Sequence, residues 1–210
     1  DVMDKETLST LPILDEDKCL KGLISVADIA KSYMNVYDSE ILAKAETPYR
    51  NILEVLEGSM VVGNPDDCVT SGKVLIGAAK PEMMENFVEE GDIVIVGDRY
   101  EAQLCAIEMK AKCVVVCTGA NVAKTITRMA EQRGCAIIQT KYDTFIASRL
   151  INQSMPIDFF MRKEGFVTFT TEDFLDDIKS VMAEKRHRDF PILDLSLIHI
   201  SEPTRQEAIS

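Results

Sequence analysis

Two stretches near the middle of the chain decide its fold: Ile93-Val-Ile-Val-Gly-Asp-Arg99 and Val114-Val-Val-Cys-Thr-Gly119. Each is a continuous apolar run that ends in a polar turn, as is typical of a strand buried on both faces of a parallel sheet. Similar runs occur before and after them. We therefore predict five strands of one sheet, at residues 59–62, 73–78, 92–96, 112–117 and 135–140.

Helical patterns separate several of these strands. Residues 81–89 begin with a proline, which suits the first turn of a helix, and they place Met83, Met84, Phe87 and Val88 on one side. A second amphipathic face consists of Val122, Ile126, Met129 and Ala130, and residues 144–151 form a third. The pattern predicts an α/β domain over residues 59–152, with a central parallel sheet and helices on both faces.

The two ends of the chain follow a different pattern. Residues 8–34 predict two strands (10–14 and 20–24) and a helix (25–33); residues 166–194 predict a strand (166–169), a helix (172–184) and a strand (190–193). Because about 30 residues rarely bury enough surface to offset chain entropy, we expect these flanks to pack on each other. The central domain would then be inserted between them.

The expected domain boundaries follow from these patterns. The first flank covers residues 1–36, a linker helix 37–58, the central domain 59–154 and the second flank 155–194. The remaining residues, 195–210, continue no periodic pattern. They begin Leu195-Ser-Leu-Ile-His-Ile-Ser-Glu-Pro-Thr-Arg205, which resembles a translated sequencing-adapter peptide, so we treat them as a non-native tail.

The composition argues against several classes of function. The 210 residues carry 23 basic and 35 acidic side chains, a net charge of −12, which disfavours binding to nucleic acid. No apolar run is long enough to span a membrane and the first ten residues lack a secretory pattern, so we expect a cytoplasmic protein that does not bind membranes. The six cysteines show no Cys-x-x-Cys spacing, and the only histidines are His187 and His199, so we expect no metal site.

The segment Gly22-Leu-Ile-Ser-Val-Ala-Asp-Ile29 is the most informative part of the first flank. A buried strand leads directly into a helix whose first turn carries Ser25 and Asp28. Such a turn can bind phosphate oxygens at the helix N-terminus and ribose hydroxyls through the carboxylate. The alternative is an ordinary helix cap, with Ser25 as N-cap and Asp28 supporting the first turn.

This segment follows Leu11-Pro-Ile-Leu-Asp15, and together they resemble the second half of a CBS domain, a module that pairs and binds adenine nucleotides. The second flank, from Val167-Thr-Phe-Thr-Thr-Glu-Asp173 to Phe190-Pro-Ile-Leu-Asp194, resembles the first half of another CBS domain. The resemblance implies that Ser25 contacts phosphate, Asp28 the ribose, and Thr168 the base or sugar. Both CBS repeats would be incomplete.

Arg186-His-Arg188 precedes the last predicted strand. These cations can complement the dipole at a helix C-terminus. They can also form a basic rim that receives a polyphosphate, because arginine supplies forked hydrogen-bond donors. We include Arg186, Arg188 and the adjacent Phe190 among the expected nucleotide-binding residues.

The turns after the two central strands are also candidate ligand sites, because ligands bind at the carboxyl ends of strands in open parallel sheets. The residues concerned are Asp98, Arg99, Thr118 and Gly119; tight connections between strand and helix explain them equally well. With Lys141-Tyr-Asp-Thr-Phe145 further along, Gly97-Asp-Arg99 resembles the DRTGG domain. The eponymous Asp-Arg-Thr-Gly-Gly run continues here with Tyr100, Glu101 and Ala102 instead.

The order of modules, a DRTGG-like insert between two CBS halves, resembles the regulatory region of CBS-containing family II inorganic pyrophosphatases. The resemblance covers about residues 1–194 and implies a homodimer that binds AMP, ADP, ATP or diadenosine polyphosphates. In that family, separate catalytic domains with a DHH motif bind manganese or cobalt and hydrolyse diphosphate to two phosphates. This chain has no Asp-His-His run, so we expect no catalytic residues and no activity of its own, with the DHH domains of the parent protein as its partners.

Two other functions fit the same sequence. One is the ligand-sensing module of a transcription regulator that combines DRTGG and CBS domains, in which we expect the DRTGG unit to precede an uninterrupted CBS pair. The other is a purely structural dimerisation module that binds no nucleotide.

Overall fold

The computed structural model of the chain describes residues 3, 8–34, 38–185 and 190–194. It divides into two compact units, unit 1 (Asp1–Met34 with Phe160–Ser210) and unit 2 (Asn35–Phe159). The predicted non-native tail, 195–210, lies outside the described residues. None of the helices in the described ranges has the length and apolar character needed to cross a membrane.

Unit 2 is built on a five-stranded sheet in the order β3-β7-β6-β5-β4. The strands are β3 (Ser59–Val62), β4 (Val74–Ile76), β5 (Ile93–Val96), β6 (Cys113–Val116) and β7 (Ala136–Gln139). Three of the four pairings are parallel, and only β3 runs antiparallel, against β7 at one edge. The predicted mostly parallel central sheet is confirmed.

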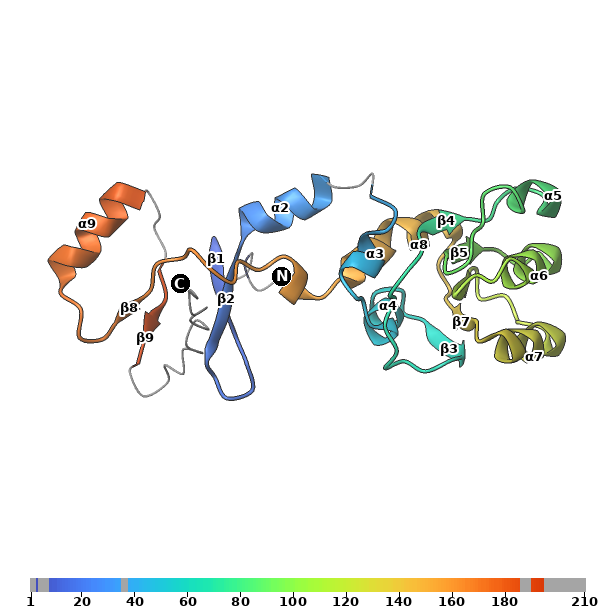
Figure 1. Cartoon of the computed structure of the whole chain (residues 1–210), viewed down its shortest axis with the longest axis horizontal. Helices are drawn as coiled ribbons and strands as arrows, with labels where there is room; N and C mark the ends of the chain where they lie inside the picture. The colour runs from blue at the N-terminus through green and yellow to red at the C-terminus, as the bar shows by residue number, and fades with distance from the viewer. Residues whose placement is uncertain (1–2, 4–7, 35–37, 186–189, 195–210) are drawn as a thin grey trace, which may run out of the picture. The chain divides into compact units, whose positions relative to one another are not determined.

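Alternate side chains of the central strands point to opposite faces of the sheet. Ile93 and Ile95 of β5 belong to one apolar cluster, and Val94 and Val96 belong to another. Figure 1 shows the helices of the second cluster, α5 (Pro81–Met84), α6 (Tyr100–Glu108) and α7 (Lys124–Arg133), on one side of the sheet. The other side carries α3 (Ile41–Lys44), α4 (Tyr49–Val55), α8 (Thr144–Leu150) and the 3-10 helix η1 (Ile151–Ser154); a second 3-10 helix, η2 (Ile157–Phe159), ends the unit.

Three helical segments differ from the predictions. The segment expected to be a linker helix forms α3 and α4, whose buried Leu42, Tyr49 and Ile52 are part of the core. The helix predicted at 81–89 ends at Met84, because the N–H groups of Asn86 and Phe87 switch to the tighter i−3 bonds of a turn. Helix α6 was not predicted, since its buried face consists largely of small residues that give a weak periodic signal.

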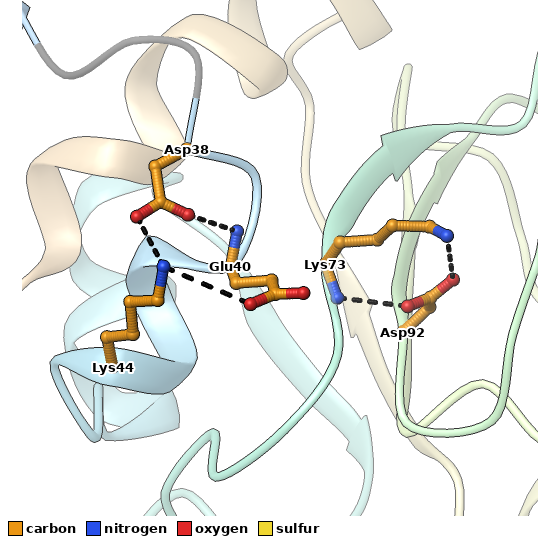
Figure 2. A network of polar contacts seen from close by, with 5 residues as sticks. All are labelled: Asp38, Glu40, Lys44, Lys73 and Asp92. Atoms are coloured by element: carbon orange, nitrogen blue, oxygen red, sulfur yellow. Dashed lines mark hydrogen bonds and ion pairs between the residues drawn. The ribbon is translucent and has the colours of Figure 1, made fainter.

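A buried carboxylate holds the starts of β4 and β5 together. The side chain of Asp92 is almost fully buried; its Oδ1 accepts the Lys73 N–H at 2.9 Å and its Oδ2 accepts the Glu89 N–H at 2.8 Å. The ammonium group of Lys73 lies 3.9 Å from the same Oδ2 (Figure 2). Because these partners satisfy the buried charge within the protein, the network has a structural role.

A second group of polar contacts in Figure 2 lies at the start of α3. Asp38 accepts hydrogen bonds from the Glu40 N–H at 3.1 Å and from the Lys44 ammonium at 2.7 Å. The ion pair with Lys44 lowers the pKa of Asp38 below its usual value, and the Glu40 N–H acts in the same direction. Next to Asp38, the carbonyl of Ser39 accepts the N–H of Val74 at 2.8 Å, which ties this loop to β4.

The described residues of unit 1 form two small two-stranded sheets and the helices α2 and α9. In the first sheet, strands β1 (Thr10–Leu14) and β2 (Leu20–Ser25) are antiparallel, and β2 leads into helix α2 (Val26–Met34). In the second sheet, β8 (Phe169–Thr170) and β9 (Ile192–Leu193) are parallel, and helix α9 (Leu175–Lys185) lies between them in sequence. The strand predicted at 166–169 instead covers Phe169–Thr170, and the strand predicted at 190–193 covers only Ile192–Leu193. Pro191 has no N–H to donate, although its carbonyl accepts the N–H of Phe169 at 3.0 Å.

The two flanks of the chain meet inside unit 1, as predicted. Leu23 of β2 and Arg162 exchange two backbone hydrogen bonds: the Leu23 N–H donates at 2.9 Å and the Arg162 N–H at 2.8 Å. A Cβ atom on Gly22 would lie 2.6 Å from the Arg162 carbonyl oxygen. The close approach of the two segments therefore requires glycine at position 22.

We expect Gly72→Ala to lower the free energy of unfolding by about 2 to 4 kcal/mol. Gly72 has a φ of +82°, and an added Cβ would lie 2.1 Å from the carbonyl oxygen of Gly91, where the turns before β4 and β5 cross. Gly97→Ala is the control, since its Cβ would meet nothing within 4 Å; it should change stability by less than about 0.5 kcal/mol. Urea unfolding of both variants tests the prediction, and equal losses would contradict it.

Candidate functional site

A pocket of about 110 Å³ lies within unit 1. Its lining comes from both flanks of the chain and combines apolar, hydroxyl and cationic side chains: Thr10, Leu23, Arg162, Gly165, Phe166, Val167, Lys185 and Phe190. Arg162 and Lys185 supply two positive charges, whereas Phe166 and Phe190 supply aromatic surface. Such a lining suits a ligand with an anionic part and a flat apolar part.

Ser25 and Asp28 form a reciprocal cap at the start of α2. The Ser25 hydroxyl donates to Asp28 Oδ2 at 2.6 Å, the Ser25 N–H donates to the same oxygen at 2.9 Å, and the Asp28 N–H donates to Ser25 Oγ at 3.3 Å. This is the capping arrangement that the sequence offered as the alternative to a ligand site. Neither residue lines the pocket, but both are connected to it through Arg162.

Arg162 joins the cap to the pocket. Its Nε lies 3.4 Å from Asp28 Oδ2, while other atoms of the same side chain line the pocket. Partial burial alone would raise the pKa of Asp28, but the hydrogen bonds from Ser25 and the charges of Arg162 and Lys31 outweigh it, so the pKa lies below its usual value. Asp28 is therefore ionised at neutral pH and able to accept hydrogen bonds.

The second flank forms the opposite wall. Phe190 lines the pocket, and its ring packs edge-on against Phe169 at a centroid distance of 5.4 Å. Thr168 lies half-buried between the pocket-lining Val167 and Phe169 but does not itself line the pocket. Arg186, His187 and Arg188 lie outside the described residues.

The second flank repeats the helix cap of the first. Asp173 Oδ2 accepts hydrogen bonds from the N–H and the hydroxyl of Thr170, just before α9. These two bonds match those from Ser25 to Asp28, although the Asp173 N–H donates to the Thr170 carbonyl and not to its hydroxyl. The pocket lining includes neither Thr170 nor Asp173. The two caps therefore differ in their relation to the pocket.

The candidate residues of unit 2 follow β5 and β6. The guanidinium of Arg99 donates from Nη2 to the carbonyls of Gly77, Ala78 and Ala79, at 3.3, 2.9 and 3.0 Å. Its charge is thus used to hold the chain segment after β4. The adjacent Asp98 is exposed.

The turn after β6 is also tied down by backbone bonds. Thr118 adopts a positive φ of 65° and donates its N–H to the Tyr142 carbonyl at 2.7 Å, and the Gly119 N–H donates to the Thr140 carbonyl at 2.8 Å. A Cβ on Gly119 would meet nothing within 4 Å. The positive φ of Gly119, 65°, rather than close packing, therefore favours glycine at this position.

We expect Arg99→Ala to destabilise the chain by about 1 to 3 kcal/mol, because three carbonyls lose a charged donor. Asp98→Ala, which changes the adjacent exposed side chain, should have little effect. Thermal unfolding compares the two variants, and equal stability of both would show that the guanidinium does not hold this segment.

Buried thiols in unit 2 are poor candidates for a reactive site. Burial raises the pKa of Cys113 well above its usual value, that of Cys117 to about 11 and that of Cys135 to about 12, so all three are protonated at neutral pH. All six cysteines are free. Within the part of the chain that the structure describes, no cluster of three or more His, Cys, Asp or Glu side chains is suited to a metal ion.

Sequence reasoning did not find Arg162, Lys185 and Thr10. Arg162 lies between segments with a recognisable pattern, in Met161-Arg-Lys163, and only the backbone pairing with Leu23 brings it to the pocket. Lys185 was part of the predicted second flank, but its position at the end of α9 carried no signal of a ligand. Local spacing does not reveal such long-range contacts.

Comparison with known proteins places the chain in a class and then in a family. Residues 51–154 match the DRTGG domain family, so the class is that of proteins with a DRTGG domain. The cobalt-dependent inorganic pyrophosphatase of Clostridium perfringens (strain 13 / Type A) is 37% identical over 193 residues, which are 92% of this chain and 35% of that protein. The probable manganese-dependent inorganic pyrophosphatase of Thermotoga maritima is 28% identical over 187 residues, 89% of this chain and 34% of that protein. The chain thus spans about a third of the length of these curated relatives.

A solved structure matches the chain over most of its length. It is the crystal structure of the CBS and DRTGG domains of the regulatory region of Clostridium perfringens pyrophosphatase, complexed with its activator, diadenosine tetraphosphate. The TM-score is 0.86 and the identity 36%, with 93% of this chain and 85% of that chain covered. This chain belongs to the family of CBS and DRTGG regulatory regions of inorganic pyrophosphatases.

Proposed function

We propose that this chain is the adenine-nucleotide-sensing regulatory region of an inorganic pyrophosphatase, a hydrolase that converts diphosphate and water to two phosphates. The observation that carries the proposal is the match, over 93% of the chain, to a regulatory region complexed with diadenosine tetraphosphate. The pocket of unit 1 supports it, because its lining combines two cations with two aromatic rings.

Each of the residues predicted to bind nucleotide has a proposed role. Asp28 accepts hydrogen bonds from the ribose, and Ser25 contacts phosphate. Thr168 contacts the base or the sugar, Phe190 packs on the base, and Arg186 and Arg188 bind the polyphosphate. The position of Asp28 beside the pocket-lining Arg162, and that of Phe190 in the lining itself, support this assignment.

Regulation in this proposal is a shift between conformations of the pair of CBS units. A nucleotide that binds one conformation more tightly changes the equilibrium, and catalytic DHH domains elsewhere in the parent protein respond to that change. AMP and ADP inhibit in this scheme, whereas ATP or diadenosine polyphosphates activate. Manganese or cobalt would be held by those catalytic domains.

Dimerisation and location are parts of the same proposal. The parent protein is a homodimer in which the regulatory regions of two subunits pair. It is cytoplasmic, where adenine nucleotides are abundant and six free thiols stay reduced.

We expect the chain to bind diadenosine tetraphosphate and AMP, and Asp28→Ala to weaken AMP binding by roughly 1 to 3 kcal/mol, the range for hydrogen bonds to a charged group. Asp173→Ala is the matched control, because it removes the same kind of helix cap at α9 without changing a neighbour of the pocket. Isothermal titration calorimetry measures both variants. If the wild type and Asp28→Ala bound AMP with equal affinity, Asp28 would have a purely structural role as a helix cap.

We also expect the purified chain to release no phosphate from diphosphate with manganese, cobalt or magnesium present. Colorimetric phosphate detection tests this, with an active inorganic pyrophosphatase as the positive control. Turnover that disappears on mutation of a residue of this chain would contradict the proposed division between regulatory and catalytic domains.

A further inference from the structure

We infer that Arg162 competes with the ligand for Asp28 and makes the pocket selective for nucleotides with several phosphates. Without a ligand, the guanidinium is paired with the Asp28 carboxylate. A bound ribose takes its place at Asp28, and the released guanidinium binds the phosphate chain. This inference rests on the proposed function and adds a residue and a selectivity to it.

The contact between Arg162 and Asp28 is loose enough to be exchanged. The distance of 3.4 Å from Nε to Oδ2 is long for a charge-assisted hydrogen bond. Nε is buried yet has no hydrogen-bond partner among the described residues. A buried donor without a partner is unfavourable, so a phosphate oxygen within reach of this guanidinium would be a better partner than the present arrangement.

The backbone of Arg162 is held while its side chain can turn. Both backbone hydrogen bonds of Arg162 go to Leu23, at 2.8 and 2.9 Å, and fix the Cα atom at the edge of the pocket. The side chain is 39% exposed and lines the pocket. Rotation about its side-chain torsions therefore moves the guanidinium between Asp28 and the pocket without moving the strand.

Asp28 does not need Arg162 to keep its orientation. Its Oδ2 already accepts two hydrogen bonds from Ser25, at 2.6 and 2.9 Å, which fix the carboxylate at the start of α2. Removal of the guanidinium would leave the carboxylate in place and free it from a competitor. A ligand that offers only ribose hydroxyls would then bind more easily.

The other pocket cation strengthens the preference for polyphosphates. Lys185 lines the same pocket at the end of α9. A ligand with one phosphate or none gains little from two cations, whereas a longer chain of phosphates can contact both Arg162 and Lys185. Arg162 therefore penalises nucleosides and favours nucleoside polyphosphates.

The test compares adenosine, AMP, ATP and diadenosine tetraphosphate by calorimetry on the 210-residue chain and on Arg162→Gln. We expect the dissociation constants of ATP and diadenosine tetraphosphate to rise at least about tenfold in the variant. That of adenosine should fall by roughly two- to fivefold, the effect of removing a partly exposed ion pair. If Arg162 had only a structural role, the dissociation constants of ATP and adenosine would not change in opposite directions.

Two further variants separate the causes. Lys31→Gln removes another cation that acts on Asp28 but does not line the pocket, so it should leave the ratio of the ATP and adenosine affinities unchanged. Arg162→Lys keeps the backbone pairing and the charge but loses the forked donors. It should reduce the preference for ATP by a smaller factor than Arg162→Gln does. If Arg162→Gln does not fold, Arg162→Lys takes its place in the test.

The outcomes are distinct. Equal loss of adenosine and ATP binding in Arg162→Gln, or no change in either, overturns the competition between Arg162 and the ligand and leaves the proposed function intact. No binding of any of these ligands to the wild-type chain overturns the proposed function itself, and the inference with it.

Discussion

Unit 1 depends on the close approach of Gly22 and Leu23 to Arg162. These residues are far apart in the sequence, yet two backbone hydrogen bonds join Leu23 and Arg162, and the space for them exists because position 22 has no side chain. The same contact places the Arg162 side chain next to Asp28 and along the pocket. One backbone pairing thus builds the junction of the two flanks and also aligns the charges of the candidate site.

The two units are stabilised in different ways. Unit 2 buries alternating side chains of a parallel sheet in two apolar clusters, and its buried Asp92 is satisfied by backbone donors at the starts of neighbouring strands. Unit 1 has short strands, capped helices and few fully buried side chains among its described residues. Unit 1 therefore relies more on capping and backbone pairing for its order, whereas the DRTGG domain is ordered by its own apolar core.

The sequence was most informative where the signal is local. Continuous apolar runs located every strand of the central sheet, and the spacing of Ser25 and Asp28 correctly marked the start of α2. It was least informative where structure depends on contacts between distant residues. Nothing near Arg162 shows that it pairs with Leu23, and nothing near Arg99 shows that it holds three carbonyls of a preceding segment. Helix α6 was missed because Ala102, Cys105 and Ala106 pack closely without the large side chains that make periodicity visible.

The insertion of unit 2 between the two flanks has a consequence for the order of folding. With residues 35–159 unfolded, pairing of Leu23 with Arg162 would close a flexible loop of about 140 residues, at an entropic cost of roughly 4 kcal/mol plus a constant. Two hydrogen bonds contribute only about 1 kcal/mol each and cannot offset that cost. A folded insert removes most of it, because the chain between the two flanks is then no longer flexible. The central domain therefore acts as a folding template for the flanks, and local unfolding within it would loosen the pocket of unit 1 without any change to the residues that line it.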